Sequence, residues 1–168
     1  MNRYTVAVLV RNQFGVLNRV TSMFRRRQFN ISSLTVSETE SNSFSRITVV
    51  FNGEEDYKQQ LINQLYKLPD VCAINELTAD SFIGRELLLI KMESTPQTDK
   101  DIEKAARAYG AVTVDCTDDT VMLQLAASSA KIDDFIDLMR DYKILEICRT
   151  GSVSLEKGSA TLRQSSER

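Results

Sequence analysis

Residues 12–36 read NQFGVLNRVTSMFRRRQFNISSLTV and carry a loop, a helix and a strand. Apolar residues recur at helical spacing from Val16 onward, which predicts a helix with one buried face. The NISSLTV that follows is alternating and rich in β-branched residues, which predicts a strand. Gly15 lies where a preceding strand, YTVAVLV at residues 4–10, passes into the helix. The loop is either an ordinary turn, or it exposes backbone N–H groups at a helix N-terminus to a negatively charged ligand.

The segments that follow complete a familiar order of elements. A strand is predicted at residues 42–53, with Ile47, Val49 and Phe51 on one face, and a helix at 54–69 that Pro69 ends. DVCAINEL at residues 70–77 predicts a fourth strand. The order strand, helix, strand, strand, helix, strand is that of a ferredoxin-like domain.

The same order then repeats about eighty residues later. Its strands are predicted at residues 85–92, 111–117, 120–127 and 144–158, and its helices at residues 94–110 and 129–143. The sequence therefore predicts an α+β protein of two tandem ferredoxin-like βαββαβ domains, at residues 1–80 and 84–158. The polar residues 159–168 are expected to form a disordered tail.

The amino-acid composition disfavours several classes of function. The chain has 168 residues, 42% of them hydrophobic, and a net charge of −2, which disfavours binding to nucleic acid. It contains no histidine, and its three cysteines form no CxxC pair, so histidine-based triads and most zinc sites are excluded. No nucleophile elbow or phosphate-binding motif is present, so no catalytic residue and no metal site is predicted. No signal peptide or membrane span is recognised, and a cytoplasmic protein is expected.

The first loop has the chemistry to hold an amino acid. Gly15 lets a ligand approach the backbone, and the amide of Asn12 both donates and accepts hydrogen bonds. The simpler interpretation is that both residues only shape a turn. The corresponding loop of the second domain, ESTPQTDK at residues 93–100, contains no glycine. The triple arginine at residues 25–27 is typical of a solvated helix end that complements the helix dipole.

Six segments together resemble one protein family. They are VLVRNQFGVLNRVTSMF, FNISSLTV, FSRITVVF, YKLPDVCAINEL, RELLLIKM and RTGSVSL, in the family's order and spacing over residues 1–158. The family is the small regulatory subunit of acetolactate synthase. The resemblance implies that the first domain is an amino-acid-sensing ACT domain. It also implies a partner, the large catalytic subunit, which carries thiamine diphosphate, FAD and magnesium, whereas this chain carries no cofactor.

The same resemblance implies the function and its residues. The small subunit activates the catalytic subunit and confers feedback inhibition by a branched-chain amino acid, most commonly valine, in isoleucine, valine and leucine biosynthesis. The effector binds between two ACT domains of a homodimer. By position, the loop side would comprise Asn12, Gly15, Val16 and Leu17, and the neighbouring chain would contribute Asn30 and Ile31. Leu17 and Ile31 are equally suited to a core, and Asn30 to a turn.

One residue departs from the family pattern, and other functions compete. The family commonly has glycine where this chain has Gln28, so the helix exit and the position of Asn30 are expected to differ. A tandem-ACT sensor that regulates a different partner is the main alternative. An RNA-binding module would need exposed aromatic residues on its central strands, where the sequence offers Tyr4, Phe44 and Phe51. A small enzyme is disfavoured by the absence of histidine.

Overall fold

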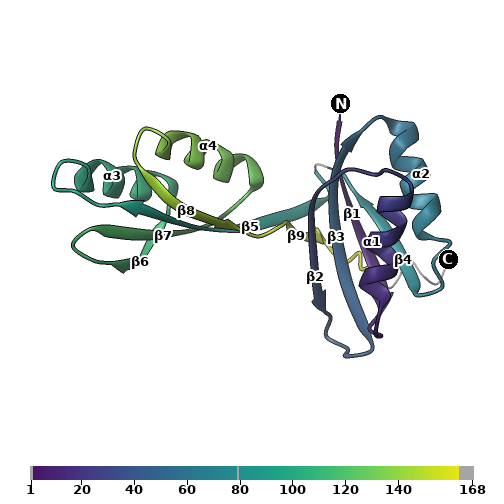
Figure 1. Ribbon diagram of the computed structural model, residues 1–168. Helices are drawn as coiled ribbons and strands as arrows, with labels where there is room; N and C mark the ends of the chain where they lie inside the picture. Colours follow the sequence, from purple (N-terminus) through teal and green to yellow (C-terminus); the bar gives the residue numbers. More distant parts are fainter. Residues whose placement is uncertain (1, 79, 163–168) are drawn as a thin grey trace. The chain divides into compact units, whose positions relative to one another are not determined.

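The computed structural model describes residues 2–78 and 80–162 (Figure 1). Its contacts divide the chain into two compact units. The first unit comprises the chain up to Ile83 together with the chain from Gly151 onward, and the second unit runs from Gly84 to Thr150. The predicted α+β fold with two βαββαβ-like sheets is confirmed. None of the described helices is both long and apolar enough to cross a bilayer.

The first unit has two helices on one face of a four-stranded antiparallel sheet (Figure 1). The strands lie in the order β2-β3-β1-β4, so β1 is central and β2 and β4 form the edges. The elements are β1 (Asn2–Arg11), α1 (Val16–Arg26), β2 (Ile31–Glu38), β3 (Phe44–Gly53), α2 (Glu55–Leu65) and β4 (Val71–Leu77). The helix α2 ends four residues before Pro69, the stop that the sequence predicts.

Strand β1 is buried on both of its faces. Val6, Val8 and Val10 pack with the helices, in one core with the predicted inward residues of β3, Ile47, Val49 and Phe51. Ala7 and Leu9 point to the other face, where they join a smaller apolar cluster. Alternate residues of a strand face opposite sides of its sheet, so β1 needs a cover on each side.

The second unit repeats this arrangement. Its strands lie in the order β6-β7-β5-β8, and β9 pairs with β5, whose first two residues belong to the first unit. The elements are β5 (Phe82–Glu93), α3 (Asp99–Tyr109), β6 (Val112–Cys116), β7 (Thr120–Ala127), α4 (Ser129–Met139) and β8 (Ile144–Arg149). The strand β9 (Val153–Glu156) lies in the part of the chain that belongs to the first unit. The core contains the predicted inward residues of both helices: Ile102, Ala105, Ala106, Tyr109, Ile132, Phe135, Ile136 and Met139. The left-handed Gly110 closes α3 as predicted.

The end of the chain differs from the prediction. In place of one closing strand over residues 144–158, the structure has two strands, β8 and β9, interrupted at residues 150–152. The chain from Gly151 onward belongs to the first unit, whereas the second domain was predicted to extend to residue 158. The tail was predicted to begin at residue 159, but Leu162 is buried. Residues 163–168 of that predicted tail lie outside the described residues.

Residues 151–162, here called the return segment, cover the sheet face that α1 and α2 leave open. Leu162 packs with Ala7 and Leu9 of the central strand. The carbonyl oxygen of Ser154 accepts a hydrogen bond of 2.7 Å from Nη2 of Arg46. The Lys157 amide donates to the carbonyl of Ser81 at 2.8 Å. These contacts explain why the predicted closing strand divides in two. The chain after the division packs on the first unit's sheet and hydrogen-bonds to its residues.

The exit of α1 keeps a left-handed residue even though that residue is not glycine. Gln28 has φ 56°, the one positive φ among the described non-glycine residues. The amide of Phe29 donates to the carbonyl of Phe24 at 2.9 Å, and that of Gln28 donates to the carbonyl of Arg25 at 3.1 Å. This is the Schellman pattern, and it directs Phe29 into the core. The expectation that Gln28 alters the helix exit is therefore wrong for the backbone, because packing of Phe29 enforces the turn.

Replacing Gln28 tests the strain in this turn. A residue with a Cβ atom costs about 1–2 kcal/mol in the left-handed region, and glycine removes this strain. Glycine also gives the unfolded chain more conformational freedom, which offsets part of the stabilisation. We expect Gln28→Gly to raise the free energy of unfolding by about 0.5–1 kcal/mol, measured by urea denaturation. Gln28→Ala keeps the strain and should be no more stable than the wild type. Equal stability of the glycine and alanine variants would show that the backbone at Gln28 is not strained.

Gly151 lies where the structure leaves no room for a side chain. A Cβ atom there would overlap Oγ1 of Thr35 and lie 3.3 Å from the Leu34 carbonyl group. We expect Gly151→Ala to loosen the return segment at a cost of about 1–3 kcal/mol. Hydrogen exchange of the amides of residues 152–162 should accelerate by at least about tenfold.

A second substitution provides the control. Oγ1 of Thr35 is buried and has no hydrogen-bond partner among the described residues, so Thr35→Ala removes no such bond. The double variant Gly151→Ala, Thr35→Ala should recover part of the lost protection, because the overlapping atom is gone. Exchange in the double variant as fast as in Gly151→Ala would show that this contact does not position the segment.

Candidate functional site

The loop between β1 and α1 leaves backbone donors open at a helix N-terminus. Gly15 is the N-cap of α1, with φ 82° and ψ −1°, and no side chain caps the helix. The amide of Val16 donates to the carbonyl of Gln13 at 3.3 Å, and the amide of Arg19 donates to Gly15 at 3.0 Å. Within the described part of the chain, the amides of Leu17 and Asn18 have no acceptor. Two N–H groups and the positive end of a helix dipole therefore face the same space.

Asn12 ties this loop to the turn between β2 and β3. Its backbone amide donates to the carbonyl of Ser43 at 2.8 Å. Its side-chain Nδ2 donates to Oε1 of Glu38 and to the carbonyl of Asn42, both at 3.0 Å. The turn-forming role that the sequence allowed is thus present. The amide oxygen of Asn12 makes no hydrogen bond to the described residues, so it can still accept one from a ligand.

A cation lies beneath the loop. Nε of Arg19 donates to Oδ2 of Asp70 at 2.7 Å, which fixes the guanidinium beside the first turn of α1. A Cβ atom at Gly15 would lie 3.5 Å from Nη1 of Arg19. The first turn of α1 carries no acidic residue. The electrostatics at Gly15 therefore favour an anionic group.

The equivalent loop of the second unit is built differently. The helix α3 carries Asp99 and Asp101 in its first turn. Oδ1 of Asp99 also accepts a hydrogen bond of 2.6 Å from Ser94. These carboxylates already complement the helix dipole and would repel a second anion. The asymmetry seen in the two loop sequences is thus an electrostatic asymmetry as well.

The six predicted site residues do not all meet in one chain. Val16 is buried in the core, so only its backbone belongs to the loop, while Leu17 is 43% exposed. Asn30 and Ile31 lie at the other end of the sheet. Ile31 pairs with Phe51, which pairs with Tyr4, seven residues before Arg11. At about 3.4 Å per residue, the two groups are separated by roughly 24 Å.

Contacts hold Asn30 and Ile31 where they are. The amide of Asn30 donates to the hydroxyl of Tyr57 at 2.8 Å, and Ile31 packs against the core. A residue outside the six predicted ones, Phe14, lies at the loop itself. The side chain of Phe14 is fully exposed. An aromatic residue next to a loop glycine in the sequence could have indicated it as a candidate site residue. The central aromatic Phe51 is fully buried and cannot stack on a base, which disfavours RNA binding.

The basic end of α1 forms a separate hollow. Arg26, Arg27 and Lys67 surround a cavity of about 400 Å³ with Met23 and Leu68. Arg25 and Arg26 occupy the last turn of the helix, as expected for cations that complement its dipole. This end of α1 is remote from Gly15, so it does not contribute to the loop.

The most buried carboxylate has a structural role. Glu86 lies in the second unit and accepts a hydrogen bond of 2.6 Å from Nε of Arg149, which also donates to Asp133 at 2.6 Å. Burial lowers the pKa of Arg149, but the hydrogen bonds to Asp133 and Glu86 together outweigh it and raise the pKa. The negative charge of Glu86 is therefore balanced by the guanidinium of Arg149. The described residues contain no cluster of side chains suited to a metal ion.

Comparison with known proteins assigns the chain to a family. Residues 6–73 match the model of the "AHAS small subunit-like ACT domain", and residues 85–158 match that of the "Small subunit of acetolactate synthase". A probable acetolactate synthase small subunit of Archaeoglobus fulgidus is 41% identical over 94% of this chain and 98% of its own. The acetolactate synthase small subunit of Bacillus subtilis is 40% identical over 92% and 90% of the two chains.

A solved structure agrees over the same length. The crystal structure of the acetolactate synthase small subunit from Thermotoga maritima superposes with a TM-score of 0.87 at 28% identity, and covers 95% of this chain and all of that one. Both units and their order are thus matched, and the chain belongs to the family of acetolactate synthase small subunits, the regulatory rather than the catalytic component.

Proposed function

We propose that this chain activates the large catalytic subunit of acetolactate synthase and makes it sensitive to inhibition by valine. The observation that supports feedback control most directly is the loop at Gly15. It presents two backbone N–H groups without acceptors among the described residues, beside the Arg19 guanidinium. An α-carboxylate fits such donors, and the amide oxygen of Asn12 fits an α-ammonium group. The catalytic cofactors, thiamine diphosphate, FAD and magnesium, would belong to the large subunit.

A homodimer would complete the effector site. The strand β2 is an edge of the sheet and presents backbone groups that a second copy can pair. An antiparallel pairing of two β2 strands about their midpoint would bring Ile31 of the partner subunit opposite Glu38, whose side chain contacts Asn12. The separation within one chain then becomes proximity between two chains. This supports the expectation that Asn30 and Ile31 act on the neighbouring effector site.

The alternative is a tandem-ACT sensor for a different partner. The ACT unit alone cannot distinguish the two functions, because amino-acid sensing is common to both. The match of residues 85–158 to a model specific to acetolactate synthase small subunits favours the first. We therefore propose that the second unit contributes to contact with the large subunit.

The dimer is tested at Val36, a partly exposed residue of the edge strand β2. In a pairing about the midpoint, Val36→Lys would place two like charges near the two-fold axis and desolvate both. We expect the wild type to sediment as a dimer at tens of micromolar, and Val36→Lys to shift toward monomer. The matched control is Val112→Lys, at an exposed valine of the second unit. A wild-type monomer, with and without valine, would refute the proposal.

The effector site is tested by Gly15→Asp. The new carboxylate would occupy the space above Arg19 and repel the carboxylate of valine. Loss of one hydrogen bond to a charged group costs about 1.5–3 kcal/mol, or roughly ten- to a hundredfold in affinity. We expect the variant to activate the large subunit while inhibition by valine shifts to at least tenfold higher concentrations. Asn12→Ala should act in the same direction but more weakly, because it adds no charge.

A second left-handed glycine supplies the control for this experiment. Gly110 has φ 74° and nothing within 4 Å of an added Cβ atom, so Gly110→Asp imposes similar backbone strain away from the loop. Its valine curve should match that of the wild type. The measurement is large-subunit activity against valine concentration. Overlay of the Gly15→Asp, Asn12→Ala and wild-type curves, with activation intact, would show that the loop is only a turn.

A further inference from the structure

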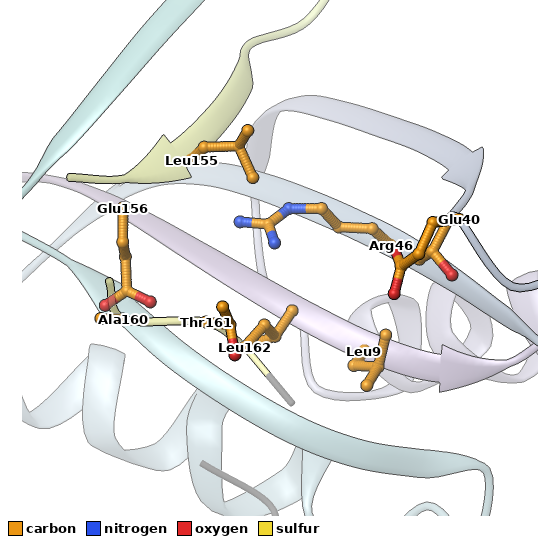
Figure 2. Close-up of a pocket in the computed structure, with 9 residues that line it drawn as sticks. Leu9, Glu40, Arg46, Leu155, Glu156, Ala160, Thr161 and Leu162 are labelled. Atoms are coloured by element: carbon orange, nitrogen blue, oxygen red, sulfur yellow. The ribbon is translucent and has the colours of Figure 1, made fainter. Parts of the chain in front are cut away.

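The two units differ in how they cover their sheets. In the first unit, the sheet face opposite the helices is covered by the return segment, where Leu162 packs with Ala7 and Leu9. Figure 2 shows part of this cover, with Leu162 next to Leu9 of β1. In the second unit, α3 and α4 lie on one face of the sheet, and no described element of that unit covers the other face (Figure 1).

The strand register identifies the residues of this uncovered face, here called the open face. Residues directly opposite each other on antiparallel strands point to the same face of the sheet. On β5, Leu88, Ile90 and Met92 belong to the core under the helices, so the residues between them point to the open face. The three rows of the open face are Leu87 with Ala126, then Val112, Gln124, Leu89 and Cys148, and then Asp115, Met122, Lys91 and Glu146.

The open face is more apolar than the solvated face of an antiparallel sheet, which normally carries polar residues. Val112 is 58% exposed and Leu87 is 37% exposed. The charged side chains of the face all lie in its third row. The apolar residues that surround Gln124 on this face are Leu87, Leu89, Val112, Met122 and Ala126. An exposed apolar patch with a polar rim is typical of a surface that binds another protein.

The size of the open face decides which protein can cover it. Four strands about 4.8 Å apart, with about five residues of 3.4 Å each, give a footprint of roughly 330 Å². Two copies of the chain packed face to face would bury roughly 650 Å², well below the 1,200 Å² or so of a stable interface. A partner with a larger surface can also contact the edge strand β6, all of whose residues are exposed.

We propose that the open face is the docking surface for the large catalytic subunit. This inference rests on the proposed function, which names that subunit as the partner. Every residue of the open face lies within residues 85–158, the part that matches the family model of acetolactate synthase small subunits. The apolar residues around Gln124 form the buried centre of the interface, and Lys91 and Glu146 belong to its polar rim.

The experiment uses the full chain and the purified large subunit, with affinity measured by calorimetry and activation by acetolactate synthesis. We expect Leu87→Lys to weaken binding by at least about tenfold, because it buries an unpaired charge in the interface. The matched control is Leu138→Lys, at a leucine of α4 that is 39% exposed and lies outside the open face. Its affinity and activation should equal those of the wild type.

A second variant keeps the test decisive if Leu87→Lys folds poorly. Val112 lies on the exposed edge strand, so Val112→Lys leaves the core intact, and it should weaken large-subunit binding by a similar factor. Wild-type affinity in Val112→Lys would overturn the inference while leaving the proposed function in place. Loss of the homodimer in Val112→Lys, with large-subunit binding unchanged, would assign the face to a second copy and also overturn it. A wild type that does not bind the large subunit would overturn the proposed function, and this inference with it.

Discussion

The first unit depends on one constraint, the burial of β1 on both of its faces. Val6 and Val8 are fully buried under the helices, and Ala7 and Leu9 are buried on the other side. Each large aliphatic side chain removed from water contributes about 1.5–3 kcal/mol, so neither face can be left open cheaply. The two helices supply one cover, and the return segment supplies the other. Two ends of the chain that are far apart in sequence therefore have to meet for the first unit to be complete.

The sequence was informative wherever a structural signal is local. Helical spacing identified the buried faces of α3 and α4, and Gly110 marked a helix end, because capping and periodicity depend on residues within a few positions. The division of the last strand was not predictable in this way. The segments forming β8 and β9 both favour extended structure, and nothing in their pattern shows that β9 packs with the first unit. The one indication in the sequence was Leu162, a large apolar residue in an otherwise polar tail.

The candidate sites divide along the same line. The Asn12 and Gly15 spacing is local, and the sequence alone suggested a site there. The positions Asn30 and Ile31 came from the family resemblance, because one chain places them roughly 24 Å away. The contact of Arg46 with the return segment was missed, although strand alternation gave a signal. Arg46 lies on the face opposite Ile47 and Val49, so a charged residue inside a strongly apolar strand indicated that something polar would cover that face.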